Sequence, residues 1–221
     1  MGQNFNSIEN VAQSSNINFD IGQLKIVRIF DKLNFQILSN SKKSVFNFLT
    51  KSKKIKGIYL YGGVGRGKSM LMDIFFQNIE FKKKRRLHFH DFMKEIHANI
   101  FLAGKKNKND DPIEVVANNF IKKTTLLCFD EMEVRDIADA MILYRLFEKL
   151  FTKGLILIST SNQMPENLYK NGLHRERFLP FIDLLNQNMN IEQIERGKDW
   201  REVFLKGKKT WLYPNNEKNK I

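Results

Sequence analysis

One stretch of the sequence has the residue types and spacing that phosphate binding requires. Gly62, Gly67, Lys68 and Ser69 complete the pattern G-x-x-x-x-G-K-[ST] of a P-loop. Glycines allow positive φ angles, so successive backbone N–H groups can turn toward an anion. Lys68 adds charge for the β- and γ-phosphates, and the Ser69 hydroxyl is a ligand for Mg²⁺. The predicted nucleotide-binding residues are Gly62, Gly63, Val64, Gly65, Arg66, Gly67, Lys68, Ser69 and Met70.

The segments around this stretch favour a P-loop over a glycine-rich turn that matches by chance. Residues 57–61 form a short apolar run typical of a buried strand. Residues 70–78 are predicted to form a helix, whose N-terminus would direct its dipole at the phosphates. Strand, loop and helix therefore follow in the order that a bound ATP needs.

A second apolar strand, predicted at 125–129, ends in the acidic pair Asp130 and Glu131. Ligands of open parallel sheets bind at the carboxyl ends of the strands, where the P-loop also lies. We therefore expect Asp130 to hold Mg²⁺, directly or through water, and Glu131 to orient and deprotonate the attacking water. The alternative, two ordinary surface acids, is disfavoured by the P-loop upstream.

A complete strand and its helices separate the P-loop from the acidic strand. This insertion, together with the Asp-Glu pair, indicates the branch of P-loop ATPases that use a catalytic glutamate. The segment 107–110 does match the guanine-recognising pattern N-K-x-D of GTP-binding proteins. However, it precedes the acidic strand, and Asp130 is not followed by the glycine of D-x-x-G. We interpret the match as accidental.

Three further polar residues are candidates for the reaction. Asn162 follows the strand predicted at 155–160, where it can reach the γ-phosphate and the attacking water; a helix cap is the alternative. Arg175 and Arg177 are candidate arginine fingers, which act on the γ-phosphate of a neighbouring subunit. At least one of these two arginines is expected to be an ordinary surface residue.

Three histidines lie close together in the sequence and raise the question of a metal site. His88 and His90 alternate along a predicted strand, and His97 follows in the next helix. No thiols or carboxylates accompany them at ligand spacing, so a structural role is favoured. Cys128, within the acidic strand, is expected to be a small buried residue.

Apolar strands and helices alternate along the chain, which predicts an α/β fold with a parallel sheet flanked by helices. Strands are expected at 57–61, 86–90, 125–129, 155–160 and 190–194. Helices are expected at 21–38, 70–78, 92–102, 112–122, 136–151, 165–169 and 175–185, with a second amphipathic segment around Val45, Phe46 and Leu49. Asp91 is expected to cap the helix that starts at Phe92.

Length and composition fit one globular domain. The chain has 221 residues, of which 42% are hydrophobic. Its single cysteine fits a reducing compartment, no apolar run has membrane-spanning length, and the N-terminus lacks a signal pattern, so a cytoplasmic location is expected. We expect a loosely ordered N-terminus (1–20), an ATPase core with N-terminal helices (21–205) and a basic C-terminal tail (206–221).

The net charge of +13 allows two interpretations of the protein surface. Lysine clusters at 51–56, 82–86, 105–108 and 206–209 are typical either of binding to nucleic acid or anionic lipid, or of solvated loops. The clusters lie between predicted elements rather than along one helix face. Solvated loops are therefore the favoured interpretation.

Several runs together resemble the ZapE family of AAA+ ATPases, the bacterial relatives of the mitochondrial Afg-type ATPases. The resemblance covers most of the chain, from Gln23 to Arg201. The runs that carry it are Tyr61–Asp73, Leu87–Met93, Cys128–Glu131, Asp136–Leu143 and Asn171–Pro180.

This resemblance implies an AAA+ module that acts as a homo-oligomeric ring and hydrolyses ATP with Mg²⁺. Bacterial members are associated with cell division through the tubulin-like protein FtsZ, and mitochondrial members with membrane-protein quality control. The family continues into an α-helical lid that carries a further arginine, whereas this chain stops at Ile221. The chain is therefore expected to be a fragment or to work without that lid.

Three functions remain open at this point. The first and favoured one is an ATP-driven remodeller of a protein client, either FtsZ or a membrane-associated protein. The second is a nucleic-acid-associated loader, because helicase loaders share this core and the charge is basic. Aromatic residues are not interleaved with the lysine clusters, which disfavours it. The third is an ATP-binding fragment without turnover.

Overall fold

The centre of the molecule is a five-stranded sheet in which every strand pair is parallel. The computed structural model describes residues 19–46, 54–106 and 109–195. The strands are β1 (Gly57–Tyr61), β2 (Lys84–His88), β3 (Leu126–Asp130), β4 (Ile156–Ser161) and β5 (Met189–Gln193). The sheet confirms the α/β class expected from the alternating pattern.

The strand order β2-β3-β4-β1-β5 decides which chain segments meet. Although β3 precedes β4 in sequence, β4 lies between β1 and β3, pairing with both. All five strands point the same way, so the segments that follow β1, β3 and β4 leave the sheet at one edge. These segments are the P-loop, the acidic pair and the segment that contains Asn162.

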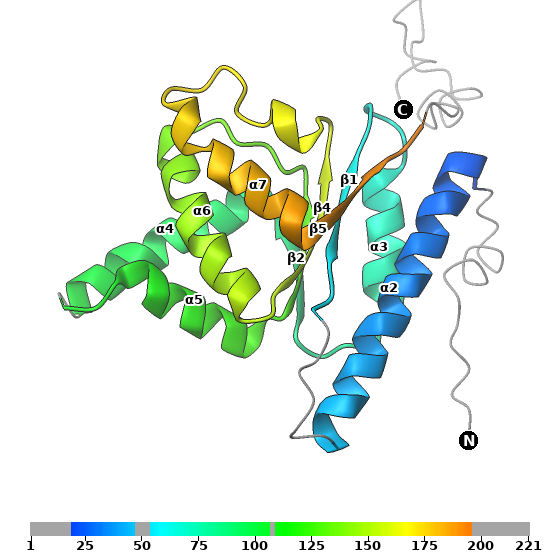
Figure 1. The fold of residues 1–221 in the computed structure, drawn as a ribbon, viewed down its shortest axis with the longest axis horizontal. Coiled ribbons are helices and arrows are strands. Elements are labelled where there is room, and N and C mark those ends of the chain that lie inside the picture. Colours follow the sequence, from blue (N-terminus) through cyan, green and yellow to red (C-terminus); the bar gives the residue numbers. More distant parts are fainter. Residues whose placement is uncertain (1–18, 47–53, 107–108, 196–221) are drawn as a thin grey trace, which may run out of the picture.

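Helices cover both faces of the sheet (Figure 1). One face carries α2 (Ile21–Phe46) and α3 (Lys68–Asn78), which pack on Ile58 and Leu60 of β1. The other face carries four helices, which pack on the opposite side chains of the same strands. They are α4 (Phe89–Lys106), α5 (Pro112–Lys123), α6 (Ile137–Thr152) and α7 (Leu179–Asn188). Because strand side chains alternate, each buried strand supplies both cores.

The N-terminal helix differs from the expectation of two separate segments. Its backbone runs unbroken from Ile21 to Phe46, because no glycine or proline interrupts the polar stretch 39–44. Its first turn is closed by a reciprocal cap: Gln23 N donates to Asp20 Oδ1 at 2.8 Å, and Asp20 N donates to Gln23 Oε1 at 3.2 Å. Leu49 lies outside the described residues.

The boundary between β2 and α4 was predicted incorrectly. The strand ends at His88 and the helix already begins at Phe89, so Asp91 lies in the first turn rather than at the cap. Leu87 and Phe89 alternate with polar residues, which is the pattern expected of a strand. However, Phe89 also belongs to a helical series of buried residues: Phe89, Phe92, Met93 and Ile96. Burial of that helix face determines the outcome.

The expected helix 175–185 is also divided. A short 3₁₀ turn covers Arg175–Arg177, and α7 begins only at Leu179. Pro180 lies in the first turn of α7, where a missing N–H is tolerated. The segment 165–169 is likewise shorter than expected, with a single 3₁₀ turn at Pro165–Asn167.

The outer parts of the expected domain division are not described by the structure. The basic tail 206–221, and the N-terminal segment apart from Phe19 and Asp20, lie outside the described residues. Within the described part of the chain, no helix combines the length and apolar character needed to cross a bilayer. Cys128 is fully buried in β3, as its sequence context predicted.

Candidate active site

The P-loop adopts a conformation that depends on its glycines. Gly65 and Gly67 both have φ near 79°, the left-handed region that residues with a Cβ disfavour. At Gly67 a Cβ would also come within 2.8 Å of the side-chain nitrogen Nε2 of Gln23. The helix α3 starts immediately afterwards, at Lys68. The loop therefore ends at a helix N-terminus, where unpaired N–H groups favour an anion.

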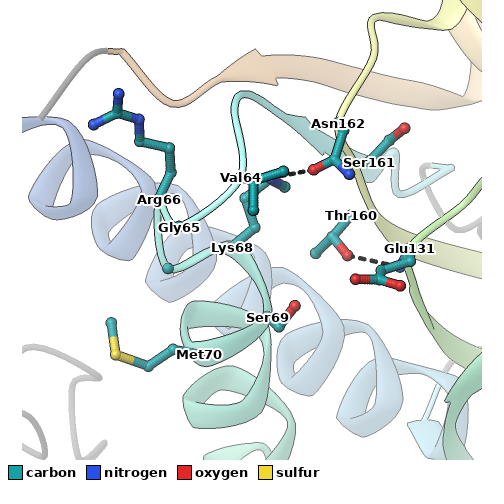
Figure 2. Close-up of a pocket in the computed structure, with 11 residues that line it drawn as sticks. Val64, Gly65, Arg66, Lys68, Ser69, Met70, Glu131, Thr160, Ser161 and Asn162 are labelled. Atoms are coloured by element: carbon teal, nitrogen blue, oxygen red, sulfur yellow. Dashed lines mark hydrogen bonds between the residues drawn. The ribbon is translucent and has the colours of Figure 1, made fainter. Parts of the chain in front are cut away.

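The Lys68 ammonium is held at the carboxyl edge of the sheet by three oxygen atoms. Its Nζ donates to Gly62 O at 2.7 Å, to Gly63 O at 2.8 Å and to Asn162 Oδ1 at 2.9 Å. Only 8% of the residue is exposed. Figure 2 shows Lys68 and Asn162 pointing toward each other across the strand ends. A buried cation fixed in this position would bind phosphate strongly.

Three oxygen-bearing side chains gather beside the ammonium. Ser69 Oγ donates to Asp130 Oδ1 at 2.6 Å, and Thr160 Oγ1 donates to the same oxygen at 2.9 Å. Asp130 and Thr160 are buried. A carboxylate and a hydroxyl within hydrogen-bond distance are hard ligands of the kind that Mg²⁺ prefers, with phosphate oxygens and water completing its shell. The donor set therefore fits the Mg²⁺ predicted at Ser69 and Asp130.

The surroundings of Asp130 keep its carboxyl group ionised. Burial raises its pKa, but hydrogen bonds from Ser69 and Thr160, and electrostatic interactions with Arg86 and His88, lower it by more. The net pKa lies below the usual value for aspartate. Arg86 Nη2 donates to Asp130 Oδ2 at 2.8 Å. A carboxylate that remains charged is what a metal ligand requires.

Glu131 is the next residue along the chain and has an unusual backbone. Its φ is 54°, a left-handed conformation that is uncommon for a residue with a side chain. Its N–H donates to Thr160 Oγ1 at 3.1 Å. The carboxylate of Glu131 lies beside the P-loop, where it is exposed. An exposed carboxylate in this position can accept a proton from water.

A cavity of about 410 Å³ joins these groups (Figure 2). Its lining includes nine residues predicted from the sequence and two that were not singled out. The predicted ones are Val64, Gly65, Arg66, Gly67, Lys68, Ser69, Met70, Glu131 and Asn162. The others are Thr160 and Ser161. Gly62 and Gly63 contribute through their carbonyl groups, which hold Lys68.

The two candidate fingers do not line this cavity, and they differ from each other. Arg175 donates to Leu168 O at 2.7 Å and to Glu166 O at 2.6 Å, so both of its terminal nitrogens bind backbone. Arg177 is exposed. Its side chain has no hydrogen bond or ion pair within the described ranges. Arg175 therefore stabilises its own loop, and Arg177 is the one that presents its charge to the surface.

Sequence reasoning missed three residues that shape the site. Thr160 was assigned only to a strand, yet its hydroxyl binds both Asp130 and the N–H of Glu131. Arg86 belonged to a lysine-rich run interpreted as a solvated surface. Gln23 is fully buried and donates to Arg66 O at 3.1 Å, linking α2 to the P-loop. The available signals were a polar residue ending a buried strand and a glutamine at helix position N3.

The histidines are distributed over two elements. His88 ends β2, while His90 and His97 lie in α4. His97 Nε2 lies 2.7 Å from Asp139 Oδ1, which ties α4 to α6. Among the residues that the structure describes, no group of three potential ligands is arranged to hold a metal ion.

The fold and the site together define a P-loop protein of the AAA+ class. Its features are the parallel sheet order, a P-loop after β1 and an Asp-Glu pair after β3. Solved AAA+ structures share the fold. DnaI has a TM-score of 0.57 at 16% identity, covering 84% of this chain and 88% of that chain. AMPPCP-bound DnaA from Aquifex aeolicus has a TM-score of 0.53 at 15% identity, covering 92% and 56%.

Sequence comparison assigns the family. A model of the AFG1-like ATPase family matches residues 6–220, and the chain belongs to this family. The cell division protein ZapE of Escherichia coli K12 is 43% identical over 172 residues, covering 77% of this chain and 45% of that protein. Lactation elevated protein 1 homolog B of Danio rerio is 41% identical over 188 residues, covering 81% and 37%. The chain spans less than half the length of both relatives. The resemblance inferred from the sequence is thus confirmed.

Proposed function

We propose that this chain is an ATP-hydrolysing AAA+ module that couples Mg²⁺-dependent hydrolysis to remodelling of a protein client. One observation carries the proposal: Lys68, Glu131 and Asn162, from the segments that follow β1, β3 and β4, face one cavity beside the P-loop. These three groups provide a base, a phosphate-binding cation and a polar side chain for the γ-phosphate.

Each residue has a distinct part in this reaction. The backbone of the P-loop and Lys68 bind the phosphates. Ser69 and Asp130 would hold Mg²⁺, which would supply charge stabilisation to the phosphates. Glu131 accepts the proton of the attacking water, and Asn162 orients the water and the γ-phosphate. The exposure of Glu131 in the lining of the cavity supports this role, because the carboxylate is accessible to water there.

The substitution Glu131→Gln tests the proposed base. It retains size and hydrogen bonding but cannot accept a proton, so turnover should fall on the order of a hundredfold or more with ATP binding retained. Glu133→Gln is the matched control, since Glu133 is an acid two residues away that pairs with Arg135. Equal turnover of parent and Glu131→Gln would reject Glu131 as the base. A parent that binds ATP without hydrolysing it would favour the ATP-binding fragment.

The proposed assembly is a homo-oligomeric ring in which Arg177 acts on the neighbouring subunit's nucleotide. Its exposure and lack of side-chain partners within the described ranges support this choice over Arg175. An exposed guanidinium that does not line the cavity of its own subunit is available to the nucleotide of a neighbouring one. Ring formation should therefore make turnover depend on protein concentration.

The 43% sequence identity to ZapE, a cell division protein, supports a cytoplasmic client in the division machinery. FtsZ is the first candidate, and a membrane-associated protein is the second. Sedimentation of FtsZ filaments should decrease when the chain and ATP are added together. The Glu131→Gln variant should not produce this decrease. Unchanged filaments would reject FtsZ as the client and leave the ATPase proposal intact.

A nucleic-acid-associated loader is the second candidate function, and the net charge of +13 favours it. Binding of this kind rests on phosphate contacts and weakens steeply with salt. Fluorescence anisotropy with single-stranded DNA, measured from low to physiological salt, separates the two candidates. Binding that persists at physiological salt and depends on ATP would favour the loader.

A further inference from the structure

The guanidinium of Arg86 lies between two carboxylates at the candidate active site. Arg86 Nη2 donates to Asp130 Oδ2 at 2.8 Å, and Nη1 donates to Asp73 Oδ1 of α3. The three side chains are 26%, 11% and 37% exposed, respectively, so the cluster is largely shielded from water. A guanidinium does not lose its proton in proteins, so this positive charge is permanent.

The other oxygen of the Asp130 carboxylate is also engaged. Oδ1 accepts hydrogen bonds from Ser69 and Thr160, so both oxygens have partners. Two neighbouring carboxylates and two hydroxyls are the ligands from which divalent-cation sites are built. Arg86 therefore occupies the position in which a cation would otherwise neutralise Asp73 and Asp130.

We propose that Arg86 is a positioning residue that makes divalent-cation binding at Asp130 conditional on a bound nucleotide. The inference rests on the proposed function, in which Asp130 serves Mg²⁺. Without phosphates, the fixed positive charge repels a second cation and saturates Asp130 Oδ2. With ATP bound, the charges of the phosphates outweigh this repulsion, and the ion binds with Ser69 and Asp130 while Arg86 keeps the carboxylate in place.

Coulomb's law sets the size of the effect. A divalent ion about 5 Å from a unit positive charge is repelled enough to lose roughly tenfold in affinity even at the dielectric constant of water, and more in a shielded cluster. The triphosphate carries several negative charges at ligand distance, and their attraction for the ion exceeds this repulsion. Removing the charge of Arg86 should therefore allow the ion to bind without the help of the phosphates.

Binding of Mn²⁺ to the full chain, followed by water-proton relaxation, tests this inference. Without nucleotide, Arg86→Gln should bind Mn²⁺ at least about tenfold more tightly than the parent protein. With a non-hydrolysable ATP analogue and protein in excess, the parent protein should bind Mn²⁺ more tightly than it does without nucleotide. The charge-neutral variant Arg86→Met should behave like Arg86→Gln, and either folded variant suffices for the test.

Arg85→Gln is the matched control. It removes the same charge from the neighbouring position of β2, but Arg85 pairs with Glu95 on the other face of the sheet. Its affinity for Mn²⁺ without nucleotide should equal that of the parent. Arg86→Lys retains the charge and should also resemble the parent, which separates electrostatics from loss of packing.

The outcomes distinguish this inference from the proposed function. If the parent binds no Mn²⁺ with the ATP analogue present, the assignment of the metal site itself fails. If the parent binds Mn²⁺ with the analogue, but removing Arg86 leaves nucleotide-free affinity unchanged, only the role of Arg86 is overturned. Nucleotide-free parent protein that binds Mn²⁺ as tightly as the analogue complex does would overturn that role without any variant.

Discussion

Replacing Thr160 by valine should loosen both acids of the candidate site while leaving the P-loop intact. The Thr160 hydroxyl donates to Asp130 Oδ1 at 2.9 Å and accepts the N–H of Glu131 at 3.1 Å. Valine has nearly the same shape, so the substitution at this fully buried position removes the two hydrogen bonds without leaving a cavity.

The expected loss of stability follows from these two bonds. A hydrogen bond to an ionised carboxylate contributes about 1.5–3 kcal/mol, and the one from a backbone N–H about 1 kcal/mol. The free energy of unfolding should therefore fall by roughly 2–4 kcal/mol at neutral pH. Turnover should fall on the order of tenfold or more, because Glu131 loses the contact that positions it, while ATP affinity stays within about threefold.

The pH dependence of this stability loss identifies its electrostatic part. The pKa of Asp130 lies below the usual value for aspartate, so its ionised form stabilises the folded state at neutral pH. This stabilisation is complete above the unfolded pKa and is lost as pH falls through the folded pKa. The stability difference between parent and Thr160→Val should accordingly be full at pH 7 and shrink as pH falls through the lowered pKa of Asp130.

Urea unfolding and steady-state ATP turnover are the two assays, with Thr160→Ser as the control. Serine retains the hydroxyl and loses only a methyl group, so its turnover should stay near that of the parent. A valine variant that is as stable and active as the parent would refute the bridging role of the hydroxyl. A serine variant as impaired as the valine variant would show that packing, and not hydrogen bonding, matters at this position.

Four further predictions concern other parts of the chain. Lys68→Ala should abolish measurable binding of a fluorescent ATP analogue, because the phosphates lose their nearest cation. Arg177→Ala should lower turnover with ATP affinity nearly unchanged, and mixing it with Lys68→Ala should restore part of the activity through interfaces that pair an intact P-loop with an intact finger. Arg175→Ala should instead lower thermal stability, because two backbone carbonyls lose their donor. Burial raises the pKa of the Cys128 thiol to about 12, so Ellman's reagent should not label the folded protein at pH 8 and should label it fully in urea.

Contrary results would overturn three of these predictions. Undiminished analogue affinity in Lys68→Ala would reject the P-loop assignment. Turnover that is independent of dilution, with no complementation by Arg177→Ala, would replace the ring with a monomeric ATPase. Rapid labelling of Cys128 in folded protein would show that β3 opens readily.

The P-loop and the acidic pair were recognisable from the sequence because their chemistry is local. Phosphate binding needs glycines, a lysine and a hydroxyl within eight consecutive residues, and the two acids directly follow an apolar strand. The alternation of strands and helices likewise determined the fold class, because burial of parallel strands requires helices on both faces. Element boundaries were predicted incorrectly where one sequence pattern fits two structures. Phe89 is the example: it alternates with polar residues as in a strand, and it is spaced from Phe92 and Ile96 as in a helix.

Other features of the site depend on contacts between residues that are distant in the sequence. Thr160 reaches Asp130 because β4 lies beside β3, and Arg86 reaches Asp130 because β2 pairs with β3 in a register that sequence alone does not specify. The sequence alone did not distinguish Arg175 from Arg177. Only the path of their loop shows that Arg175 binds backbone carbonyls and that Arg177 is exposed. The sequence thus determined which chemical groups are present, whereas packing of the strands decided which of them share one carboxylate.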